Sequence, residues 1–513
     1  MLRGMILGLA LALTLSHPTF ANTEPAGITA EASPVDAEVQ LLKEAAEKFD
    51  NNDNTSARRQ IDAVVASPAF AQLNPNQQYI ALYMLGWLKV NSREKGALET
   101  VKRATAMTDF STGRDWHLRL QADGQAGDDT DAILTLTTIA QRWPGSLAQV
   151  SDQFIRNLVN RTGNQKSLDD SRFQLLLTLK AAFWQTTDPF DSPENEWVAL
   201  TRGLLERGRV HDAQAAAESV TSYYAVETML LDKQFDPVTQ ADPARFNLKN
   251  AMDHELVDLR AKVKANPDSL EGVNQLALML VTADQPQAAL DILDSAIARA
   301  REKDGSAASF SDPDQLNWTY NQRALALLHL GKVDEAIALM KLGAARPENG
   351  SLNVSQQLNL AQIYEEEGRP AEAMAVMTDG DTWDLSPYGK MDMQGVRVCA
   401  AAQLHDEAQV GRSLSYMRVH LDDAPGWSID AFICAGDIDS AAKIVIDELA
   451  DPVHRGSALS DLQDAPFGPN LSPVVRARKQ LMQTLYQRPD VKAAAETVGH
   501  HLPSPFQAWG MGR

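Results

Sequence analysis

The chain has 513 residues, of which 44% are hydrophobic and 22% charged, a composition typical of folded proteins rather than disordered ones. This length allows several globular units or one long repeat array. The formal charge of -21 at pH 7 opposes binding to nucleic acid or to an anionic membrane, because both are negative and require a basic patch on the protein.

The first 21 residues have the features of an export signal. Arg3 precedes an apolar run from Met5 to Leu15, and Thr19-Phe20-Ala21 forms a small-x-small cleavage site. The run is shorter than the roughly 20 residues that span a bilayer, and no later stretch is long and apolar enough. We therefore expect residues 1–21 to be removed, residues 22–37 to be a flexible N-terminal segment, and the protein to be periplasmic or secreted, without a transmembrane segment. The alternative is an uncleaved anchor or a buried first helix.

Residues 38–232 contain weak copies of one spacing, in which an alanine follows a glycine by five residues. Gly127 with Ala132 and Gly208 with Ala213 are examples. This spacing predicts degenerate helical repeats. The next stretch, residues 233–250, contains two Asp-Pro pairs and is predicted to be a linker.

Residues 251–465 contain the clearest repeats. Gly331 and Ala336 in LHLGKVDEAIALM recur 37 residues later as Gly368 and Ala373. A second small residue stands twelve positions before each alanine, and Asp284 replaces the glycine in one copy. The alanine pairs are Ala277 with Ala289, Ala324 with Ala336, and Ala361 with Ala373. Small residues at this spacing allow two helices to cross closely, and a glycine after the first helix closes the turn.

The pattern resembles the tetratricopeptide repeat, a helix-turn-helix unit of about 34 residues. Leu360-Ala361, Tyr364, Gly368 and Ala373 carry the resemblance most clearly. It implies an all-α solenoid of antiparallel helix pairs with a concave inner wall. Residues 466–513, with helices expected at Val474–Tyr486 and Val491–His500, would form the C-terminal helical cap.

In the resembled family, the first helix of each unit lines the concave wall. Mapping that face onto this sequence gives a peptide-binding groove of Asn274, Leu278, Asn321, Leu325, His329, Gln362 and Glu365. The asparagines would bind a peptide backbone, and Glu365 with Glu366 would bind basic side chains, so the expected partner is an apolar and basic peptide or protein. Two alternatives stay open: these residues face water, or a segment of the same chain fills the groove.

No catalytic signature is present, and the sequence indicates no cofactor. Asp50 to Ser56 has calcium-loop spacing but lacks the glycine and the closing glutamate, so a polar turn is expected there instead of a metal site. His500-His501 lacks a third ligand. Cys399 and Cys434 are one repeat apart, and they are either a disulfide or two buried thiols.

Two classes of function follow. The first is a non-catalytic interaction scaffold or adaptor of the cell envelope, and the second is an all-helical enzyme or binding protein acting on glycans or peptidoglycan. Paired buried carboxylates in a deep pocket would favour hydrolysis, while an open trough would favour protein binding.

Overall fold

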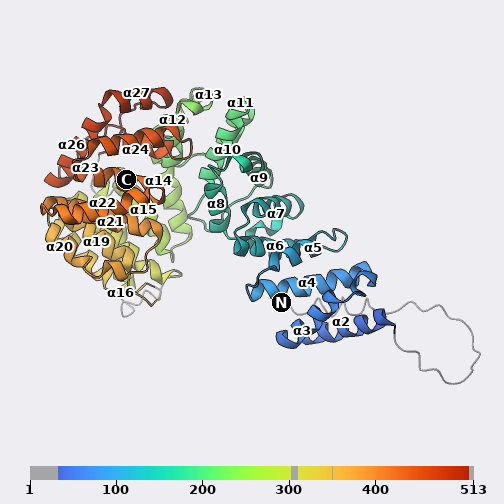
Figure 1. Ribbon diagram of the computed structural model, residues 1–513. Helices are drawn as coiled ribbons and strands as arrows, with labels where there is room; N and C mark the ends of the chain where they lie inside the picture. The colour runs from blue at the N-terminus through green and yellow to red at the C-terminus, as the bar shows by residue number, and fades with distance from the viewer. Residues whose placement is uncertain (1–32, 302–309, 349, 508–513) are drawn as a thin grey trace, which may run out of the picture. The chain divides into compact units, whose positions relative to one another are not determined.

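The computed structural model describes residues 33–301, 310–348 and 350–507, and within these ranges the regular elements are helices (Figure 1). Isolated β-bridges join Asp232 to Gly499 and Glu348 to Ser351. No helix in the described ranges combines the length and apolar character needed to cross a membrane. The expected export signal, residues 1–21, lies outside the described residues. The chain is a helical-repeat protein with two compact units, which divide between Thr187 and Asp188.

The first unit is a succession of antiparallel helix pairs. The first helix in its described part begins at Pro34, inside the segment expected to be flexible, because Ser33 caps it by accepting a hydrogen bond from Asp36 N at 3.2 Å. Its elements are α2 (Pro34–Asp50), α3 (Asn54–Ala66), η2 (Phe70–Gln72), α4 (Pro75–Asn91), α5 (Ala97–Thr105), α6 (Gly113–Ala126), α7 (Asp129–Arg142), η3 (Pro144–Gln149), α8 (Asp152–Arg161), η4 (Lys166–Leu168) and α9 (Asp169–Ala181).

The second unit also consists of consecutive helices that pack in pairs. Its elements are α10 (Glu194–Glu206), α11 (Val210–Ala217), α12 (Tyr223–Leu231), η5 (Lys233–Phe235), α13 (Asp236–Thr239), α14 (Leu248–Ala265), α15 (Leu270–Thr282), α16 (Pro286–Arg301), η6 (Pro313–Gln315), α17 (Leu316–His329), α18 (Val333–Ala344), α19 (Val354–Glu366), α20 (Pro370–Val376), η7 (Gly380–Thr382), α21 (Pro387–Gln403), α22 (Glu407–Val419), η8 (Leu421–Asp423), α23 (Pro425–Cys434), α24 (Ile438–Ala450), α25 (Arg455–Asp461), α26 (Pro473–Tyr486) and α27 (Pro489–Val498).

The alanine pairs lie at the helix crossings, as the spacing predicts. Each of the six is completely inaccessible to solvent, at 0% exposure: Ala277, Ala289, Ala324, Ala336, Ala361 and Ala373. The turns between paired helices are closed by left-handed residues, with φ of 75° at Gly331 and 69° at Gly368. Asp284, which replaces the glycine in one copy, adopts φ 57°. The repeat spacing therefore predicts both the close crossing of the paired helices and the left-handed residue in the turn between them.

Residues 233–250 are folded into the second unit and do not form a linker. Phe235 is 0% exposed, Val238 3% and Phe246 5%, so apolar side chains anchor the segment on both sides of its Asp-Pro pairs. Pro237 stands at the start of α13, a position where a proline is compatible with a helix. The Asp-Pro pairs mark local turns, and the boundary between compact units falls earlier in the chain.

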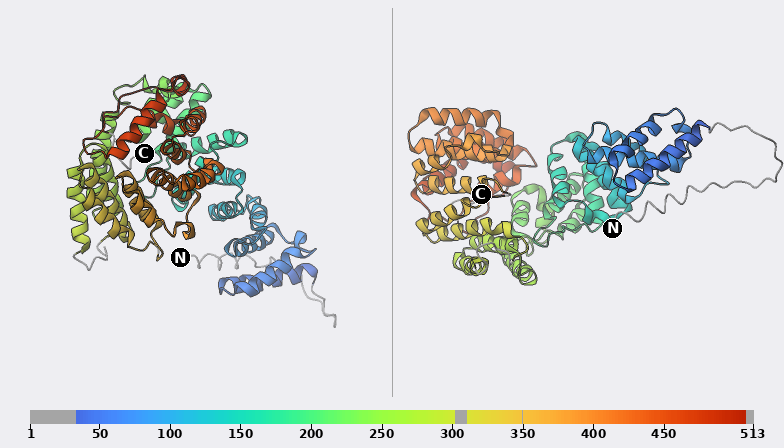
Figure 2. Two further views of the ribbon diagram at one scale, coloured as in Figure 1. Left: turned by 60° about the vertical axis from the view of Figure 1, so that its left-hand side comes forward. Right: turned by 90° about the horizontal axis from the view of Figure 1, so that it is seen from below.

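The C-terminal helices occur where the sequence predicts them, but they do more than cap the end of the array. Helix α25 packs on α12, and this contact joins the C-terminal part of the second unit to its N-terminal part. Helix α27 packs on α24. His500 N donates to Leu231 O at 2.8 Å, and an Arg455 nitrogen lies 3.5 Å from Asp232 Oδ2. In the left view of Figure 2, the red C-terminal helices lie on the inner side of the arc of yellow-green helices. The second unit is therefore closed on itself.

Candidate functional site: a chamber and a groove

The predicted groove is occupied by the C-terminal segment, residues 463–507. Asn470 Nδ2 donates to His329 O at 2.9 Å, Ser472 Oγ donates to Glu366 O at 2.5 Å, and Gln507 N donates to Asp284 Oδ2 at 3.1 Å. The sequence left open whether the groove residues face water, bind a partner or are covered by a segment of the same chain. In the structure, a segment of the same chain covers them.

The predicted groove residues do not form one continuous free surface. Asn274 is buried and donates from Nδ2 to Gln315 O at 3.2 Å, while Leu278 is half-buried. His329 lies beside Asp284, with 3.4 Å between Nε2 and Oδ1. None of these three lines the cavity described below.

Glu365 is satisfied within the chain. Its side chain is 2% exposed and pairs with Arg478 of α26, and Gln403 Nε2 donates to its Oε1 at 2.6 Å. Arg478 thus supplies the positive charge that was predicted to come from a bound peptide. Burial opposes the charge of Arg478, but the neighbouring Glu365 and Asp430 carboxylates raise its pKa. The expectation that Glu365 binds a basic partner is corrected accordingly.

A chamber of about 740 Å³ remains between the repeat wall and the C-terminal segment, and it is accessible to solvent, since Tyr388 in its lining is 58% exposed. Three predicted groove residues, Asn321, Leu325 and Gln362, line it. Its aromatic lining consists of Tyr223, Tyr224, Trp318, Tyr388, Trp427, Phe467, Tyr486 and Phe506. Its charged lining consists of six acids (Glu227, Glu366, Asp384, Asp392, Asp430 and Asp461) and two bases (Arg478 and Lys479).

Burial changes the protonation of two acids in this lining. Desolvation raises the pKa of Glu366 to about 7, against the opposing influence of Arg478. Desolvation also raises the pKa of Glu227, although hydrogen bonds from Ser460 and Tyr223 oppose it. These carboxyls exchange protons closer to neutral pH than ordinary glutamates do.

The two cysteines form a disulfide between adjacent repeats. Cys399 in α21 and Cys434 in α23 are bonded at 2.06 Å, with their Cα atoms 5.0 Å apart. Glu365 lies near both sulfurs, and the potential ligand atoms of the three residues are within 4.8 Å of one another. Because bonded sulfurs are not thiolates, this cluster lacks the ligands of a metal centre.

The other metal candidates have structural partners. Asp53, in the Asp50–Ser56 turn, caps α3 by accepting from Ser56 N at 3.1 Å. His500 Nε2 lies 2.7 Å from Asp236 Oδ1, and His501 Nε2 lies 3.1 Å from Asp464 Oδ2. Both histidines therefore tie the C-terminal segment to the second unit or to itself.

The first unit has an open groove of about 980 Å³ that is lined mainly by α4, α6 and α8. Tyr83 and Trp87 come from α4, His117 and Gln121 from α6, and Phe154 from α8. All three aromatic side chains are half-buried, whereas Gln121 is exposed. No segment of the described chain fills this groove in the way that α26 fills the second unit.

Arginines stand at the edges of this groove. Exposed Arg114 hydrogen-bonds the Tyr83 hydroxyl, and Arg161 pairs with Asp129 at 2.6 Å while lying 5.9 Å from the centroid of Phe154. Burial lowers the pKa of His117, whose Nε2 is 3.0 Å from Ser146 Oγ. The groove therefore offers an apolar, aromatic floor with the exposed Arg114 at its edge. The sequence signal for this groove is the aromatic residues on α4 and α8, but residues 146–190 lack the Gly-Ala spacing that marks the repeats elsewhere.

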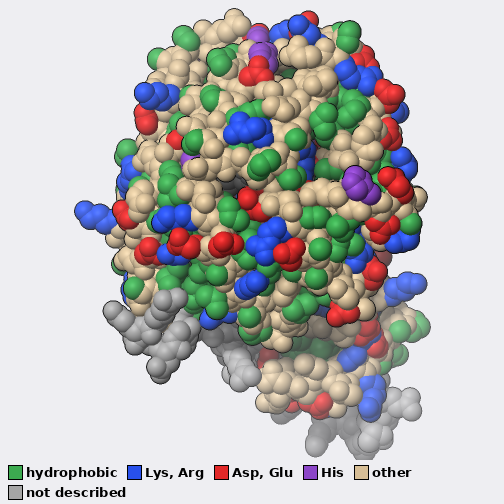
Figure 3. Space-filling model, turned by 90° about the vertical axis from the view of Figure 1, so that its left-hand side faces the viewer, with side chains coloured by type: hydrophobic (Ala, Val, Ile, Leu, Met, Phe, Trp, Pro, Cys, Tyr) green, Lys and Arg blue, Asp and Glu red, His purple; other side chains and the backbone are tan. Residues whose placement is uncertain are grey.

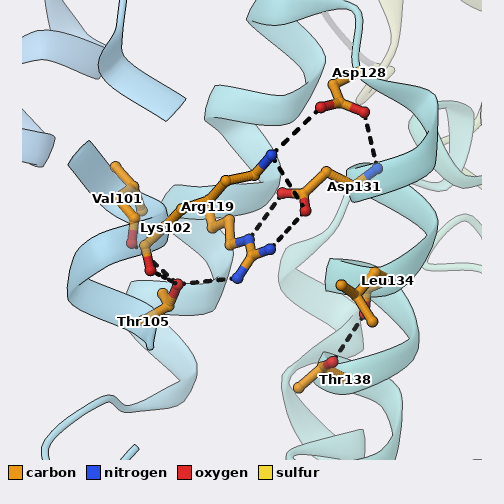
Figure 4. Close-up of polar contacts among 8 residues, drawn as sticks. All are labelled: Val101, Lys102, Thr105, Arg119, Asp128, Asp131, Leu134 and Thr138. Atoms are coloured by element: carbon orange, nitrogen blue, oxygen red, sulfur yellow. Dashed lines mark hydrogen bonds and ion pairs between the residues drawn. The ribbon is translucent and has the colours of Figure 1, made fainter. Parts of the chain in front are cut away.

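A buried charged network holds α5, α6 and α7 together (Figure 4). Arg119 donates to Asp131 through Nε at 2.9 Å and Nη2 at 2.6 Å, and through Nη1 to Thr105 Oγ1 at 3.1 Å. Lys102 Nζ lies 3.4 Å from Asp128 and 3.5 Å from Asp131. A bidentate buried pair of this kind fixes the orientation of α6, which carries much of the groove.

The two units differ strongly in charge. Residues 188–513 contain 29 Lys and Arg against 48 Asp and Glu, whereas residues 1–187 contain 18 against 20. On the face drawn in Figure 3, acidic, basic and hydrophobic side chains are interspersed. The negative charge of the protein therefore resides in the unit that contains the chamber.

Comparisons with known proteins add little to this description. No protein-family model matches the chain, and no curated protein matches it. Among solved structures, the chain is similar to one titled "Structure of Naa15/Naa10 bound to HypK-THB", at 13% identity and a TM-score of 0.23, covering 89% of this chain and 82% of that chain. It is also similar to a circular tandem repeat protein with novel repeat topology, at 12% identity and a TM-score of 0.12, covering 90% and 97%. At these scores neither likeness carries an argument about the site.

Proposed function

We propose that the protein is an exported, non-catalytic scaffold of the tetratricopeptide-repeat type that binds a partner protein in the cell envelope. The Gly-Ala spacing, with every paired alanine at a helix crossing, supports the repeat assignment. The features of residues 1–21 support export to the periplasm or the medium.

The partner binds in the open groove of the first unit. One observation carries this assignment: the concave wall of the second unit is filled by α26, while the groove lined by α4, α6 and α8 is open. Half-buried aromatics at a groove floor are the side chains that usually anchor partner segments. Because the exposed Arg114 stands at its edge, the preferred partner is apolar with an acidic flank, in place of the basic partner expected from Glu365.

Photo-cross-linking tests this assignment. A photoreactive residue at Gln121, in the groove, is expected to capture a defined protein from an envelope extract, and Arg114→Glu is expected to reduce that capture. The matched control is a photoreactive residue at Leu134 of α7, which is 54% exposed but does not line the groove. Equal capture from Gln121 and Leu134 would remove the proposal.

A second candidate function, hydrolysis of a glycan, is favoured by the acids that line the chamber of the second unit. Glu366, with its pKa raised to about 7, has the protonation expected of a general acid, and Asp392 lines the same space. The test is release of reducing sugars from peptidoglycan by the wild-type protein and by Glu366→Gln. Absence of release by the wild type, or equal release by both, would eliminate this candidate.

A further inference from the structure

The part of the C-terminal segment that covers the repeat wall, residues 466–480, is held lightly. It consists of the loop before α26 and the first two turns of that helix, and we call it the strap. Among residues 466–480, Val475 is the one large apolar side chain that is buried, at 6% exposure. A segment that buries little apolar surface opens locally at a lower cost than the rest of the fold.

The inner face of the strap borders the chamber. Val475, Arg478 and Lys479 line this space, which is accessible to solvent beside the exposed Tyr388. Side chains that border an open space have fewer packing partners than side chains in a closed core. Lifting the strap therefore separates few apolar contacts.

Contacts at both ends of the strap fasten it to the second unit. Before it, Gln463 Oε1 accepts from Leu502 N at 2.6 Å, and after it, Leu485 is 0% exposed in the apolar cluster of the C-terminal repeats. Within the strap, Arg476 Nη2 donates to Gly468 O at 3.2 Å, which holds the loop against the helix. These contacts define a segment that opens as one piece between two fixed ends.

The wall under the strap is supported by its own repeats. Leu360, Ile363 and Tyr364 of α19 are 4%, 1% and 3% exposed, and they belong to the apolar core of the clear repeats. Helix α19 therefore keeps its place when the strap lifts.

The contacts of the strap define the chemistry that the wall recognises. The Asn470 and Ser472 side chains donate to backbone carbonyl oxygens at the ends of α17 and α19, and Arg478 pairs with the buried Glu365 carboxylate. Ser472 is the N-cap of α26, and Arg478 lies on the second turn of the same helix. The wall thus accepts a helix that begins with a side-chain donor and carries an arginine.

We propose that the strap is displaceable and that the wall beneath it is a second binding surface, which takes a helix of another protein with the same chemistry. That helix has Ser or Asn at its N-cap for the wall carbonyls and an arginine on its second turn for Glu365. In the resting protein the strap occupies this place, so it acts as an intramolecular competitor of the partner. The proposal does not depend on the partner groove of the first unit.

An anisotropy titration of the full-length protein with a fluorescent peptide of residues 466–486 tests this proposal. The wild type is expected to bind the peptide weakly, because its own strap competes. Arg478→Met in the protein weakens the competitor but keeps Glu365, so the peptide should bind at least about tenfold more tightly than to the wild type. A peptide that itself carries Arg478→Met should bind this variant at least about tenfold more weakly, because it cannot pair with Glu365. Asn470→Ala in the protein keeps the buried pair and should tighten binding in the same direction.

Arg418→Met is the matched control, because the Arg418 side chain is 51% exposed and its pair with Asp437 lies outside the strap. In the Arg478→Met protein, a disulfide between Gly331→Cys and Asn470→Cys fixes the start of the strap and should abolish binding, which either single cysteine retains. Unchanged far-ultraviolet circular dichroism verifies that each variant is folded.

The proposal is overturned if the peptide binds the Arg478→Met and Asn470→Ala proteins no more tightly than the Arg418→Met protein, or if the disulfide leaves binding unchanged. Dimerisation of the Arg478→Met protein in analytical ultracentrifugation would also overturn it, because a second copy of the chain would then occupy the wall.

Discussion

Replacing Arg478 by methionine tests how the C-terminal segment is held on the repeat wall. The Arg478 side chain is 15% exposed and its partner Glu365 is 2% exposed, so the substitution leaves an uncompensated carboxylate in the interior. Methionine retains the apolar stem of the arginine, which limits the change to the charge and its hydrogen bonds.

Breaking a buried pair by removing one partner costs about 3–5 kcal/mol. At roughly 1.4 kcal/mol per tenfold, amide hydrogen exchange in α26 should accelerate by between about a hundredfold and a few thousandfold. Burial raises the pKa of Glu365, so the carboxyl takes up a proton more readily in acid, and the measurement is best made at pH 7.5.

Hydrogen exchange followed by mass spectrometry measures the exchange rate of α26 directly, in peptides covering residues 473–486. The double substitution of Arg478 and Glu365 to methionine should recover most of the protection, because no unpaired charge remains. Lys443→Met is the control. The Lys443 and Asp447 side chains are 76% and 59% exposed, and such exposed pairs contribute at most about 1 kcal/mol to stability. The reasoning is refuted if Arg478→Met changes exchange in α26 no more than Lys443→Met does.

Three further predictions concern stability. Replacing Cys399 and Cys434 by serine opens a loop of 35 residues and should lower the free energy of unfolding by about 3–4 kcal/mol, measured by urea denaturation. Gly272→Ala places a Cβ 2.2 Å from the Phe190 ring and should destabilise by about 1–3 kcal/mol, whereas Gly411→Ala at an exposed position of α22 should stabilise by about 0.5–1 kcal/mol. Burial raises the pKa of Asp123 to about 8, so Asp123→Asn should gain stability relative to wild type as pH rises from about 4 to 8.

The sign of the last prediction follows from proton binding. Between these pH values the folded protein retains the Asp123 proton and the unfolded chain has lost it, so wild-type stability falls as pH rises through this window. A parallel pH dependence in wild type and Asp123→Asn would contradict it.

Equal effects of Gly272→Ala and Gly411→Ala would contradict the close packing at α15, and an unchanged urea midpoint in the serine variant would contradict the disulfide.

The repeat architecture was predictable because its signal is local. Alanines twelve residues apart and a left-handed residue between them, as at Ala324, Gly331 and Ala336, are direct requirements of a close helix crossing and a tight turn. The periodicity of one segment carries this information without reference to the rest of the chain.

The occupied groove was not predictable in the same way. The pair of Glu365 with Arg478 joins residues 113 positions apart, and no periodicity connects them. The Asp-Pro pairs near Phe235 and Phe246 indicated turns correctly, but only the packing of those rings shows that the segment belongs to the second unit. The boundary at Thr187 likewise depends on contacts between distant helices.

The central claim, that residues 463–507 lie along the inner wall of the second unit, is tested most directly by an engineered cross-link between Gly331→Cys and Asn470→Cys. A Cβ at Gly331 would lie 3.4 Å from Asn470 Cβ, close to the roughly 3.5–4.5 Å of natural disulfides. We expect a high yield of a 331–470 cross-link in oxidised protein by peptide mapping, and none between Gly411→Cys and Asn470→Cys. Two reduced cysteines that both react with maleimide under native conditions would contradict the account.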